Sequence, residues 1–248
     1  MNELKELLEF AVELGRGAGD VTLEYFRKKP ETSTKDDGSY VTIADREAEK
    51  YLRRQIAERF PDDGCVGEEE GESTGTSGRR WIVDPIDGTF AFVHGVPFYG
   101  VLIALEVDGE SVVGVVNIPA LGELVSAAKG LGCFLNGEPA RVSDTAALKD
   151  ALLLSTDFAA STERLRARAK ASRTWGDCYG YVLVATGRAD VMLDPVMNLW
   201  DCAPLLPIME EAGGTFTDWR GARTIDGGNS IATNGVLFDE VMSLIRGE

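Results

Sequence analysis

Two aspartates, Asp84 and Asp87, lie three residues apart in the segment WIVDPIDGT, directly after a short apolar run. Pro85 favours an extended backbone at Asp84, and Gly88 permits the tight turn that follows. Both carboxylates can therefore converge on one point, with the Ile86 carbonyl between them as a neutral oxygen ligand. Like charges this close repel each other, so a cation is expected between them. A ligand set made only of oxygen suits Mg²⁺, which completes its shell with waters and phosphate oxygens.

The turn after Asp87 also predicts an anion site beside the cation. The backbone N–H groups of Gly88, Thr89 and Phe90 come next in the chain and would point at a bound phosphate if they open a helical turn. A metal-free interpretation stays open at this point, because Asp-Pro and Asp-Gly pairs commonly only shape turns. The spacing within this motif fits both interpretations.

Two further acidic segments bear on that choice. Residues 62–72, DDGCVGEEEGE, contain consecutive glutamates at 68–70, and such a run usually forms a solvated surface. Asp201 follows Trp200 at the start of a predicted helix, LWDCAPLLPIMEEAGG, where an aspartate commonly acts as an N-cap. Each segment therefore has an ordinary structural explanation when it is taken singly.

Composition narrows the possible partners and compartments. The chain has 248 residues, 44% of them hydrophobic, and its formal net charge of -16 would repel a phosphate backbone, so we expect no nucleic-acid partner. No apolar segment approaches the length of about 18 residues typical of a membrane helix, and the N-terminal segment lacks the basic and apolar regions of a secretion signal. The four cysteines form no CxxC pair and lie in apolar sequence, which is typical of reduced thiols. We therefore expect a cytoplasmic protein without a membrane partner.

The first sixty residues predict two helices. Apolar residues at helical spacing predict the first helix from residue 4 to about residue 27, and Thr42 with Asp45 predicts a capping box at the start of the second. In the second helix, Glu49 and Arg53 are interpreted as an ordinary surface pair at i,i+4. The segment GRGAG at 15–19 has a phosphate-loop composition, but no strand precedes it, so we interpret it as a helix end or turn. The polar residues 28–40 are predicted to form a loop.

The remaining chain predicts an α/β (α+β) fold in two halves. From residue 81 to about residue 139, alternating apolar runs with turns at Asp108-Gly109 and Asn136-Gly137 predict an antiparallel meander. From about residue 142, strands and helices alternate, with a charged helix over 161–172 among them. We expect residues 1–141 to form an α+β half with the main metal and phosphate site, and residues 142–248 to form an α/β half that carries Asp201 and the substrate-side residues.

Three motifs, taken together, resemble the inositol monophosphatase family of magnesium-dependent, lithium-sensitive phosphatases. They are GEE at 67–69, WIVDPIDGT at 81–89 and WDCAPLLPIMEEAGG at 200–214, in the order and spacing of the family, and VTIAD at 41–45 matches a further family segment. The resemblance covers nearly the whole chain. It implies a layered αβαβα sandwich, a homodimer and a hydrolase that acts on a small phosphorylated substrate.

The resemblance implies a metal-ligand set. Carried over position by position, it makes Glu68, Asp84, Asp87 and Asp201 ligands of two or three Mg²⁺ ions, with the Ile86 carbonyl as a further ligand. It places Asp84 between two metals. Two metals about 3.5 to 4 Å apart would clamp the attacking and leaving oxygens of an in-line displacement.

The resemblance also implies roles around these ligands. Glu68 and Thr89 would orient and help deprotonate the attacking water, with Asp45 supporting Thr89 from behind. Glu69 would lie behind the ligands, and Lys35 would lie on the loop near the entrance. The family often has asparagine where this chain has Ala91, and that departure puts a supporting hydrogen bond of the turn in doubt.

The resemblance also bears on the substrate, through the second half of the chain. The segment 176–201, GDCYGYVLVATGRADVMLDPVMNLWD, most resembles the histidinol-phosphatase branch of the family. By this resemblance Asp194 and Asp177 would lie near the organic part of the substrate, and a turn residue is the alternative interpretation of Asp177. Two acids there favour a cationic alcohol such as that of L-histidinol phosphate, which belongs to histidine biosynthesis. An inositol-1-monophosphatase, or a broad sugar or nucleotide phosphatase, remains the alternative. A catalytically silent metal or phosphate sensor is the alternative of another class.

Overall fold

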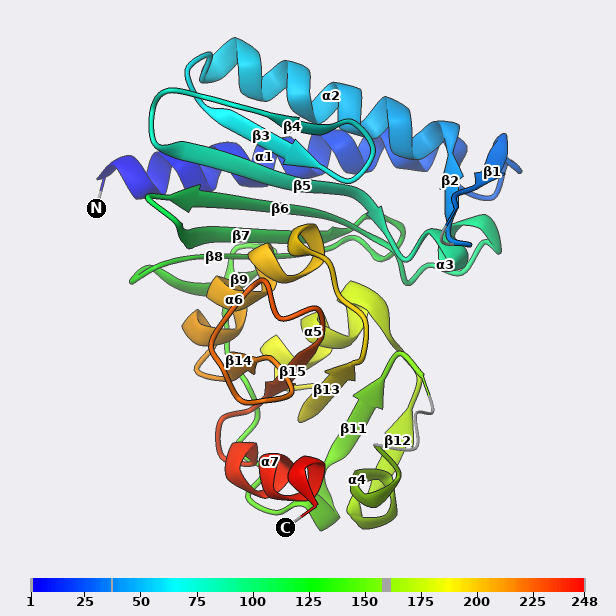
Figure 1. The fold of residues 1–248 in the computed structure, drawn as a ribbon, viewed down its shortest axis with the longest axis vertical. Helices are drawn as coiled ribbons and strands as arrows, with labels where there is room; N and C mark the ends of the chain where they lie inside the picture. Colours follow the sequence, from blue (N-terminus) through cyan, green and yellow to red (C-terminus); the bar gives the residue numbers. More distant parts are fainter. Residues whose placement is uncertain (1, 37, 158–161, 248) are drawn as a thin grey trace.

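Helices and sheets alternate through the molecule in five layers, as the view in Figure 1 shows from top to bottom. The computed structural model describes residues 2–36, 38–157 and 162–247. Helices α1 (Asn2–Tyr25) and α2 (Ile43–Arg59) cover one face of an eight-stranded sheet. Helices α5 (Asp177–Ala185) and α6 (Leu199–Glu211) lie between this sheet and a five-stranded one. The layered αβαβα sandwich expected for the chain is thus confirmed.

The first two helices form largely as their sequences predict. The capping box of α2 is present: the Thr42 side chain accepts a hydrogen bond from the backbone of Ala44, and Asp45 accepts one from the backbone of Thr42. Helix α1 ends two residues earlier than expected. The GRGAG prediction was wrong, because residues 15–19 lie inside α1, where a side chain at Gly17 would overlap Tyr51. Small residues there let α1 pack closely.

The eight-stranded sheet contains the predicted meander. Its strands follow the order β10-β9-β8-β7-β6-β5-β3-β4, and β5 to β10 pair antiparallel in sequence. The strands are β3 (Gly64–Gly67), β4 (Gly71–Ser73), β5 (Arg79–Asp87), β6 (Gly100–Val107), β7 (Glu110–Ile118), β8 (Glu123–Ala128), β9 (Gly132–Leu135) and β10 (Glu138–Ala140). The sequence did not predict that β3 pairs parallel with β5. A separate hairpin, β1 (Thr32–Thr34) with β2 (Tyr40–Thr42), occupies the predicted loop.

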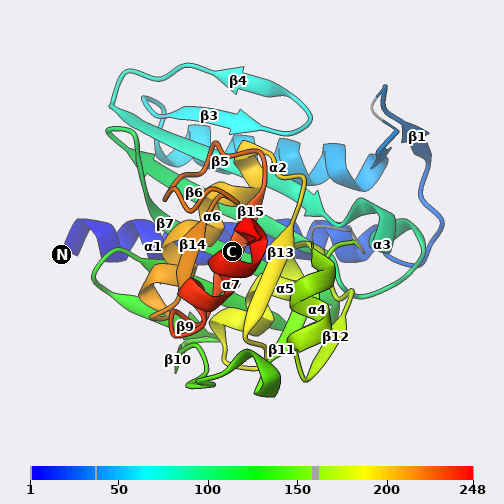
Figure 2. The same cartoon turned by 60° about the horizontal axis from the view of Figure 1, so that its bottom comes forward.

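The second half alternates strands and helices as expected. The five-stranded sheet has the order β12-β11-β13-β15-β14, and its strands are β11 (Leu152–Ser155), β12 (Ala171–Arg173), β13 (Val191–Asp194), β14 (Thr215–Thr217) and β15 (Ser230–Thr233). Figure 2 shows α4 (Glu163–Arg168) and α7 (Phe238–Arg246) from the side of the fifth layer. Helix α4 is shorter than the predicted 161–172 helix, whose first residue lies outside the described residues. The division at residue 141 stays a prediction.

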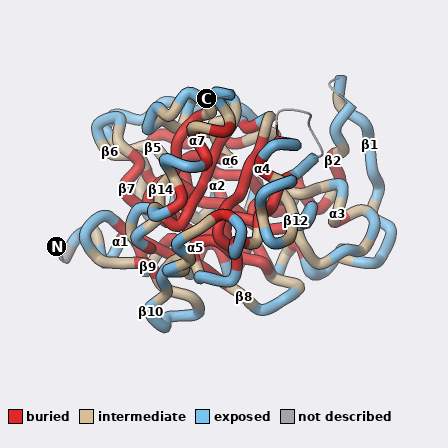
Figure 3. The backbone as a smooth tube through the Cα atoms, turned by 90° about the horizontal axis from the view of Figure 1, so that it is seen from below, coloured by how far each residue is buried: buried red, intermediate tan, exposed pale blue. Residues whose placement is uncertain are grey.

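Short helical turns join the main elements. They are α3 (Thr89–Val93) and two 3₁₀ turns, Pro119–Leu121 and Leu148–Asp150. The buried chain lies in the centre of the molecule, with exposed segments such as β1 outside it (Figure 3). All four cysteines are free and buried, as predicted for structural thiols. Among the described residues, no helix has both the length and the apolar character needed to cross a membrane.

One buried pair corrects the sequence prediction. The Glu49 side chain is fully buried and that of Arg53 is 16% exposed, although their i,i+4 spacing was interpreted as an ordinary surface pair. The surrounding chain explains the difference, since the turn after β3 folds over this part of α2 and contacts both side chains.

Candidate metal and phosphate site

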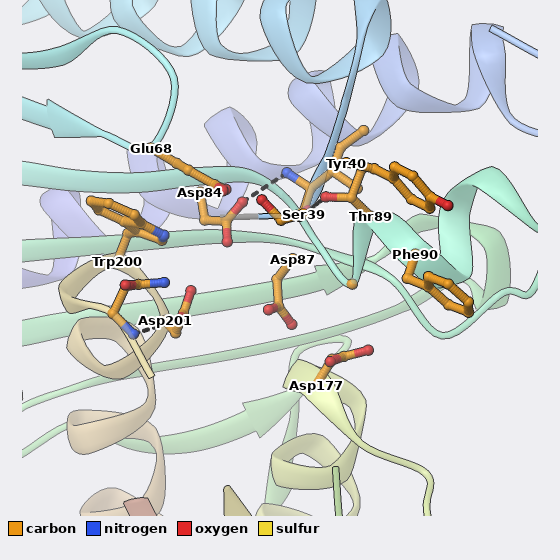
Figure 4. Close-up of a pocket in the computed structure, with 14 residues that line it drawn as sticks. Ser39, Tyr40, Glu68, Asp84, Asp87, Thr89, Phe90, Asp177, Trp200 and Asp201 are labelled. Atoms are coloured by element: carbon orange, nitrogen blue, oxygen red, sulfur yellow. Dashed lines mark hydrogen bonds between the residues drawn. The ribbon is translucent and has the colours of Figure 1, made fainter. Parts of the chain in front are cut away.

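Two acidic side chains leave the large sheet at the same edge. Strands β3 and β5 run parallel, and their last paired residues are Gly67 and Val83. Glu68 and Asp84 each come one residue later. Because the carboxyl ends of parallel strands meet at one edge of a sheet, these two carboxylates lie side by side, as Figure 4 shows.

A bulge in β5 brings the next aspartate to the same place. The pairing of β5 with β6 shifts between Asp84 and Asp87, and the backbone N–H of Ile86 donates to Asp84 Oδ1 over 2.9 Å. Gly88 follows with φ of 79°, a left-handed conformation that glycine adopts without strain, and α3 begins at Thr89. This is the extended segment and tight turn predicted from Pro85 and Gly88.

Helix α6 supplies the third aspartate. Asn198 caps the helix, and Asp201 completes a capping box by accepting a hydrogen bond of 2.7 Å from the backbone N–H of Asn198. Asp84, Asp87 and Asp201 each offer a carboxylate oxygen, and the three oxygens lie within 4.8 Å of one another. Figure 4 shows the three side chains reaching one cavity from β5 and α6. The three aspartates are brought together as predicted.

The electrostatics of this cluster favour a bound cation. Burial raises the pKa of Asp84 and Asp87 well above the usual range, and neighbouring carboxylates raise it further. Burial, with the charges of nearby acids, raises the pKa of Asp201 to about 7. Among the described residues that line this pocket of about 300 Å³, none is a lysine or arginine. An oxygen-only set of repelling carboxylates suits a hard divalent cation such as Mg²⁺, so the residues present fit the ion.

Glu68 adjoins this cluster and carries a second contact. Lys35 Nζ donates to Glu68 Oε1 over 2.7 Å and to Glu69 Oε1 over 2.6 Å. Burial alone would lower the pKa of Lys35, but these hydrogen bonds outweigh it and raise that pKa above its usual value. Glu68 is not part of the tight trio of aspartates, although its charge is among the causes that raise the pKa of Asp84. The β1–β2 hairpin is therefore tied to the turn that carries both glutamates.

Thr89 lies between two acceptors. Its Oγ1 is 3.0 Å from the Ile86 carbonyl oxygen and 3.4 Å from Asp45 Oδ1. A hydroxyl has one proton, so Thr89 donates to one acceptor at a time. Asp45 is fully buried, and burial raises its pKa to about 6 despite hydrogen bonds from Thr42. The predicted support of Thr89 by Asp45 is geometrically available, and the Ile86 carbonyl, predicted as a metal ligand, also faces the Thr89 hydroxyl.

The predicted phosphate turn lines the same pocket. Gly88, Thr89 and Phe90 are all among its lining residues. Phe90, a residue that is 66% exposed, stacks its ring on Tyr40 of the hairpin and on His94. His94 Nδ1 also lies 2.8 Å from the Phe90 carbonyl oxygen, which agrees with a hydrogen-bonding rather than a catalytic histidine. Ala91, the departure from the family pattern, lies within α3.

A second pocket of about 220 Å³ adjoins the first, since Asp87, Asp177 and Asp201 line both. Asp194 lines only the second pocket. Its buried carboxylate accepts hydrogen bonds from Thr156 Oγ1 over 2.6 Å and from the backbone of Val196 over 3.2 Å. Burial raises the pKa of Asp194 to about 6. The predicted substrate residues thus flank a cavity next to the acidic cluster.

Sequence reasoning missed several lining residues. Asp157 and Thr156 follow the end of β11, which pairs parallel with β13, so both emerge beside Asp194. The signal that could have found them is the pair of apolar runs ALLLST and ADVMLD. If the two runs are read as parallel neighbouring strands, the residues at their carboxyl ends must lie side by side at the edge of the sheet that holds the site. The first pocket is also lined by Ser39, Tyr40, Asn198 and Trp200.

Comparison with known proteins identifies the family. A profile described as the inositol monophosphatase family matches residues 3–247. The chain is 46% identical over 248 residues to a histidinol-phosphatase from Chlorobaculum parvum, covering 96% of each sequence. It is 42% identical to a histidinol-phosphatase from Mycobacterium tuberculosis, covering 86% of this chain and 87% of the other.

A solved structure agrees with this assignment. The IMPase of Thermotoga maritima superposes with a TM-score of 0.90 at 33% identity, covering 98% of this chain and 97% of that one. Sequence motifs, layered fold and clustered aspartates therefore lead to one conclusion. The chain belongs to the inositol monophosphatase family.

Proposed function

We propose that this protein is a Mg²⁺-dependent phosphoric monoester hydrolase that converts L-histidinol phosphate into L-histidinol and phosphate. The observation that carries the chemistry is the convergence of three aspartates on one pocket without a compensating basic side chain among its described lining residues. Family membership and the two relatives named histidinol-phosphatase, 46% and 42% identical, support the substrate.

The proposed ion-binding groups are the four acids of the site and one carbonyl. Asp84, Asp87, Asp201, Glu68 and the Ile86 carbonyl would hold two or three Mg²⁺ ions. When bound, the ions would neutralise phosphate charge and make a coordinated water more acidic. Asp84 adjoins both Glu68 and Asp201, whose charges contribute to its raised pKa, so it is the best placed carboxylate to be shared.

The chain's own groups would orient the reactants. Glu68 and Thr89 would orient the attacking water and help deprotonate it, with its proton passing to the Glu68 carboxylate, while Asp45 would fix the Thr89 hydroxyl from the buried side by accepting its hydrogen bond. The N–H groups of Gly88, Thr89 and Phe90 would hold phosphate oxygens. The water oxygen would bond to phosphorus while the bond from phosphorus to the alcohol oxygen breaks, and the leaving oxygen would take a proton from a second water molecule.

The second pocket would take the organic part of the substrate. Asp157, Asp177 and Asp194 line it, and no lysine or arginine is among its described lining residues. Three carboxylates from separate segments create a negative field that favours a cationic group. The ammonium group of L-histidinol carries that charge, whereas a neutral polyol does not.

The test is initial-rate phosphate release from L-histidinol phosphate, inositol 1-phosphate, fructose 1,6-bisphosphate and 3′-phosphoadenosine 5′-phosphate, with and without Mg²⁺. We expect kcat/KM for histidinol phosphate to exceed the others by about a hundredfold, which corresponds to about 2.7 kcal/mol of transition-state stabilisation. Asp87→Asn should abolish release, and Asp144→Asn, at an exposed position, is the matched control. A flat profile would contradict the substrate, and the absence of turnover would favour a metal or phosphate sensor.

Inositol phosphate is the second candidate substrate. The Thermotoga maritima protein with the same fold is named an IMPase, and carboxylates such as Asp194 also accept hydrogen bonds from polyol hydroxyls. The substrate panel distinguishes the two, because a preference for inositol 1-phosphate would reverse the expected order of kcat/KM.

We further propose a cytoplasmic, lithium-sensitive homodimer. The four free, buried cysteines agree with a reducing compartment. The dimer and the lithium sensitivity rest on the family resemblance. Light scattering during gel filtration tests the dimer, and a mass near 26.8 kDa, that of one chain, would contradict it.

A further inference from the structure

A buried carboxylate behind the acidic cluster has no place in the proposed chemistry. Glu49 lies in α2 and is fully buried. Its Oε2 accepts a hydrogen bond of 2.8 Å from the backbone N–H of Glu69, and its Oε1 accepts one of 3.0 Å from the backbone N–H of Glu70. Burying a charge is costly unless it is paired, so this arrangement indicates a specific structural purpose.

Arg53 completes the arrangement one helical turn later. Its Nε donates to Glu49 Oε1 over 2.8 Å, and its Nη2 donates to the carbonyl oxygen of Gly71. Helix α2 therefore contacts the backbone of three consecutive residues, 69–71. Gly67 permits this approach, because a Cβ there would overlap the Glu49 carboxylate and crowd Arg53.

The clamped segment is the turn that carries Glu68. Residues 68–70 join β3 to β4, and all residues of β4 are exposed, so the strand itself has little packing to hold the turn. Lys35 Nζ reaches this turn through the side chains of Glu68 and Glu69 and not through its backbone. The pairing of Gly67 with Gly71 closes the two ends of the turn, and α2 holds the backbone between them through Glu49, which is not among the described residues that line the pocket.

We propose that Glu49, held by Arg53, is a positioning residue that fixes the 68–70 turn and thereby aims the Glu68 carboxylate at the aspartate cluster. The inference rests on the proposed function for the role of Glu68 as a metal ligand and water-orienting group. Glu49 acts through backbone N–H groups, so it needs two accepting oxygens. A glutamine offers one accepting oxygen and a donor that opposes a backbone N–H.

The test compares Glu49→Gln with Glu47→Gln, an identical change at a neighbouring, more exposed glutamate of α2 that pairs with Lys50. Hydrogen exchange on residues 64–73 reports the turn, and electron paramagnetic resonance with Mn²⁺ alone reports cation affinity without turnover. We expect Glu49→Gln to speed amide exchange in the turn and to weaken Mn²⁺ binding about 10- to 100-fold, as for other groups that orient metal ligands. The Glu47→Gln protein should match wild type in both.

A second variant keeps the proposal open to refutation if Glu49→Gln fails to fold. Arg53→Lys retains the positive charge but cannot donate to Glu49 and Gly71 with one planar group, so it should give a smaller loss in the same direction. Faster exchange with unchanged Mn²⁺ affinity would overturn the proposal, and so would unchanged exchange. A wild-type protein that binds Mn²⁺ normally but releases no phosphate would contradict only the proposed function.

Discussion

At the scale of single residues, the Thr89 hydroxyl offers the sharpest test of the proposed water activation. It has two acceptors, the Ile86 carbonyl and Asp45, and its proton can serve only one of them. Thr89→Val keeps the side-chain shape and removes the hydroxyl. We expect kcat to fall about 10²- to 10⁴-fold, the usual contribution of one positioned proton-transfer group, with KM nearly unchanged.

Thr89→Ser is the matched variant, because it keeps the hydroxyl and removes only a methyl group. Steady-state kinetics on histidinol phosphate should give a kcat for Thr89→Ser within a few-fold of wild type. Equal losses in both variants would show that the methyl contact matters rather than the hydroxyl, and would remove Thr89 from the water-orienting pair.

The sequence predicted where a side chain lies when its position depends only on the backbone of neighbouring residues in the chain. Asp84 and Asp87 converge because a proline, a bulge and a left-handed glycine follow each other within one short segment. Glu49 was assigned wrongly for the opposite reason, since i,i+4 spacing states which side chains pair and says nothing of what covers them. Asp157 depended on a parallel pairing between distant strands, which local patterns do not reveal.

At the scale of elements, the close contact between α6 and strand β7 positions Asp201. Gly114 in β7 faces the carbonyl of Pro204 in α6, and a Cβ there would overlap that oxygen. Gly114→Ala should therefore push α6 off the sheet. We expect a loss of about 1–3 kcal/mol in the free energy of unfolding, as for other overpacked cores, and weaker Mg²⁺ activation because Asp201 moves with the helix.

Gly15→Ala is the control for this substitution. Gly15 lies in α1, which packs on the face of β7 opposite α6. The added methyl group has Val115 Cγ1 of β7 as its nearest contact at 3.2 Å, and alanine favours the surrounding helix. Urea unfolding and Mg²⁺ titration of activity measure both proteins. A Gly114→Ala protein with normal stability and normal Mg²⁺ activation would refute the role of this contact.

Elements with a clear period or an apolar run were predicted, including the four-residue strands β11, β13 and β15, and the three-residue strands β12 and β14 were not. The long amphipathic helices and the meander have repeats of several turns or alternations, whereas β12 and β14 contain three residues each. The pairing of β3 with β5 creates the edge where Glu68 meets Asp84, and it joins segments across an intervening hairpin. Such non-local pairing depends on packing of the whole sheet, which a single sequence pattern does not specify.

At the scale of the whole molecule, the acidic cluster links stability to pH and to the cation. Asp201 has a pKa of about 7 in the folded protein, whereas an unfolded aspartate has a pKa of about 3.9. Asp84 and Asp87 are shifted in the same direction. Between these values the folded state binds more protons than the unfolded state. The free energy of unfolding of the metal-free protein should therefore fall as pH rises from about 4 to 7, at most by about 1.4 kcal/mol per pH unit for each such group.

Mg²⁺ should reverse that loss, since it replaces the protons that hold the carboxylates together. Urea unfolding in chelator should give lower stability at pH 8 than at pH 5, and Mg²⁺ at a hundredfold excess over its Kd should restore about 2.7 kcal/mol at pH 8. Asp87→Asn removes one repelling charge from the cluster, so it should flatten the pH dependence and reduce the stabilisation by Mg²⁺. The same variant also controls for the overall charge of the protein. Its net charge stays close to the -16 of the wild type, so repulsion over the whole surface would leave the pH dependence of stability almost unchanged. Equal stability of the metal-free wild type at pH 5 and pH 8 would mean that burial and mutual repulsion do not raise the pKa of these aspartates in the folded protein, and the cation site would lose its electrostatic basis.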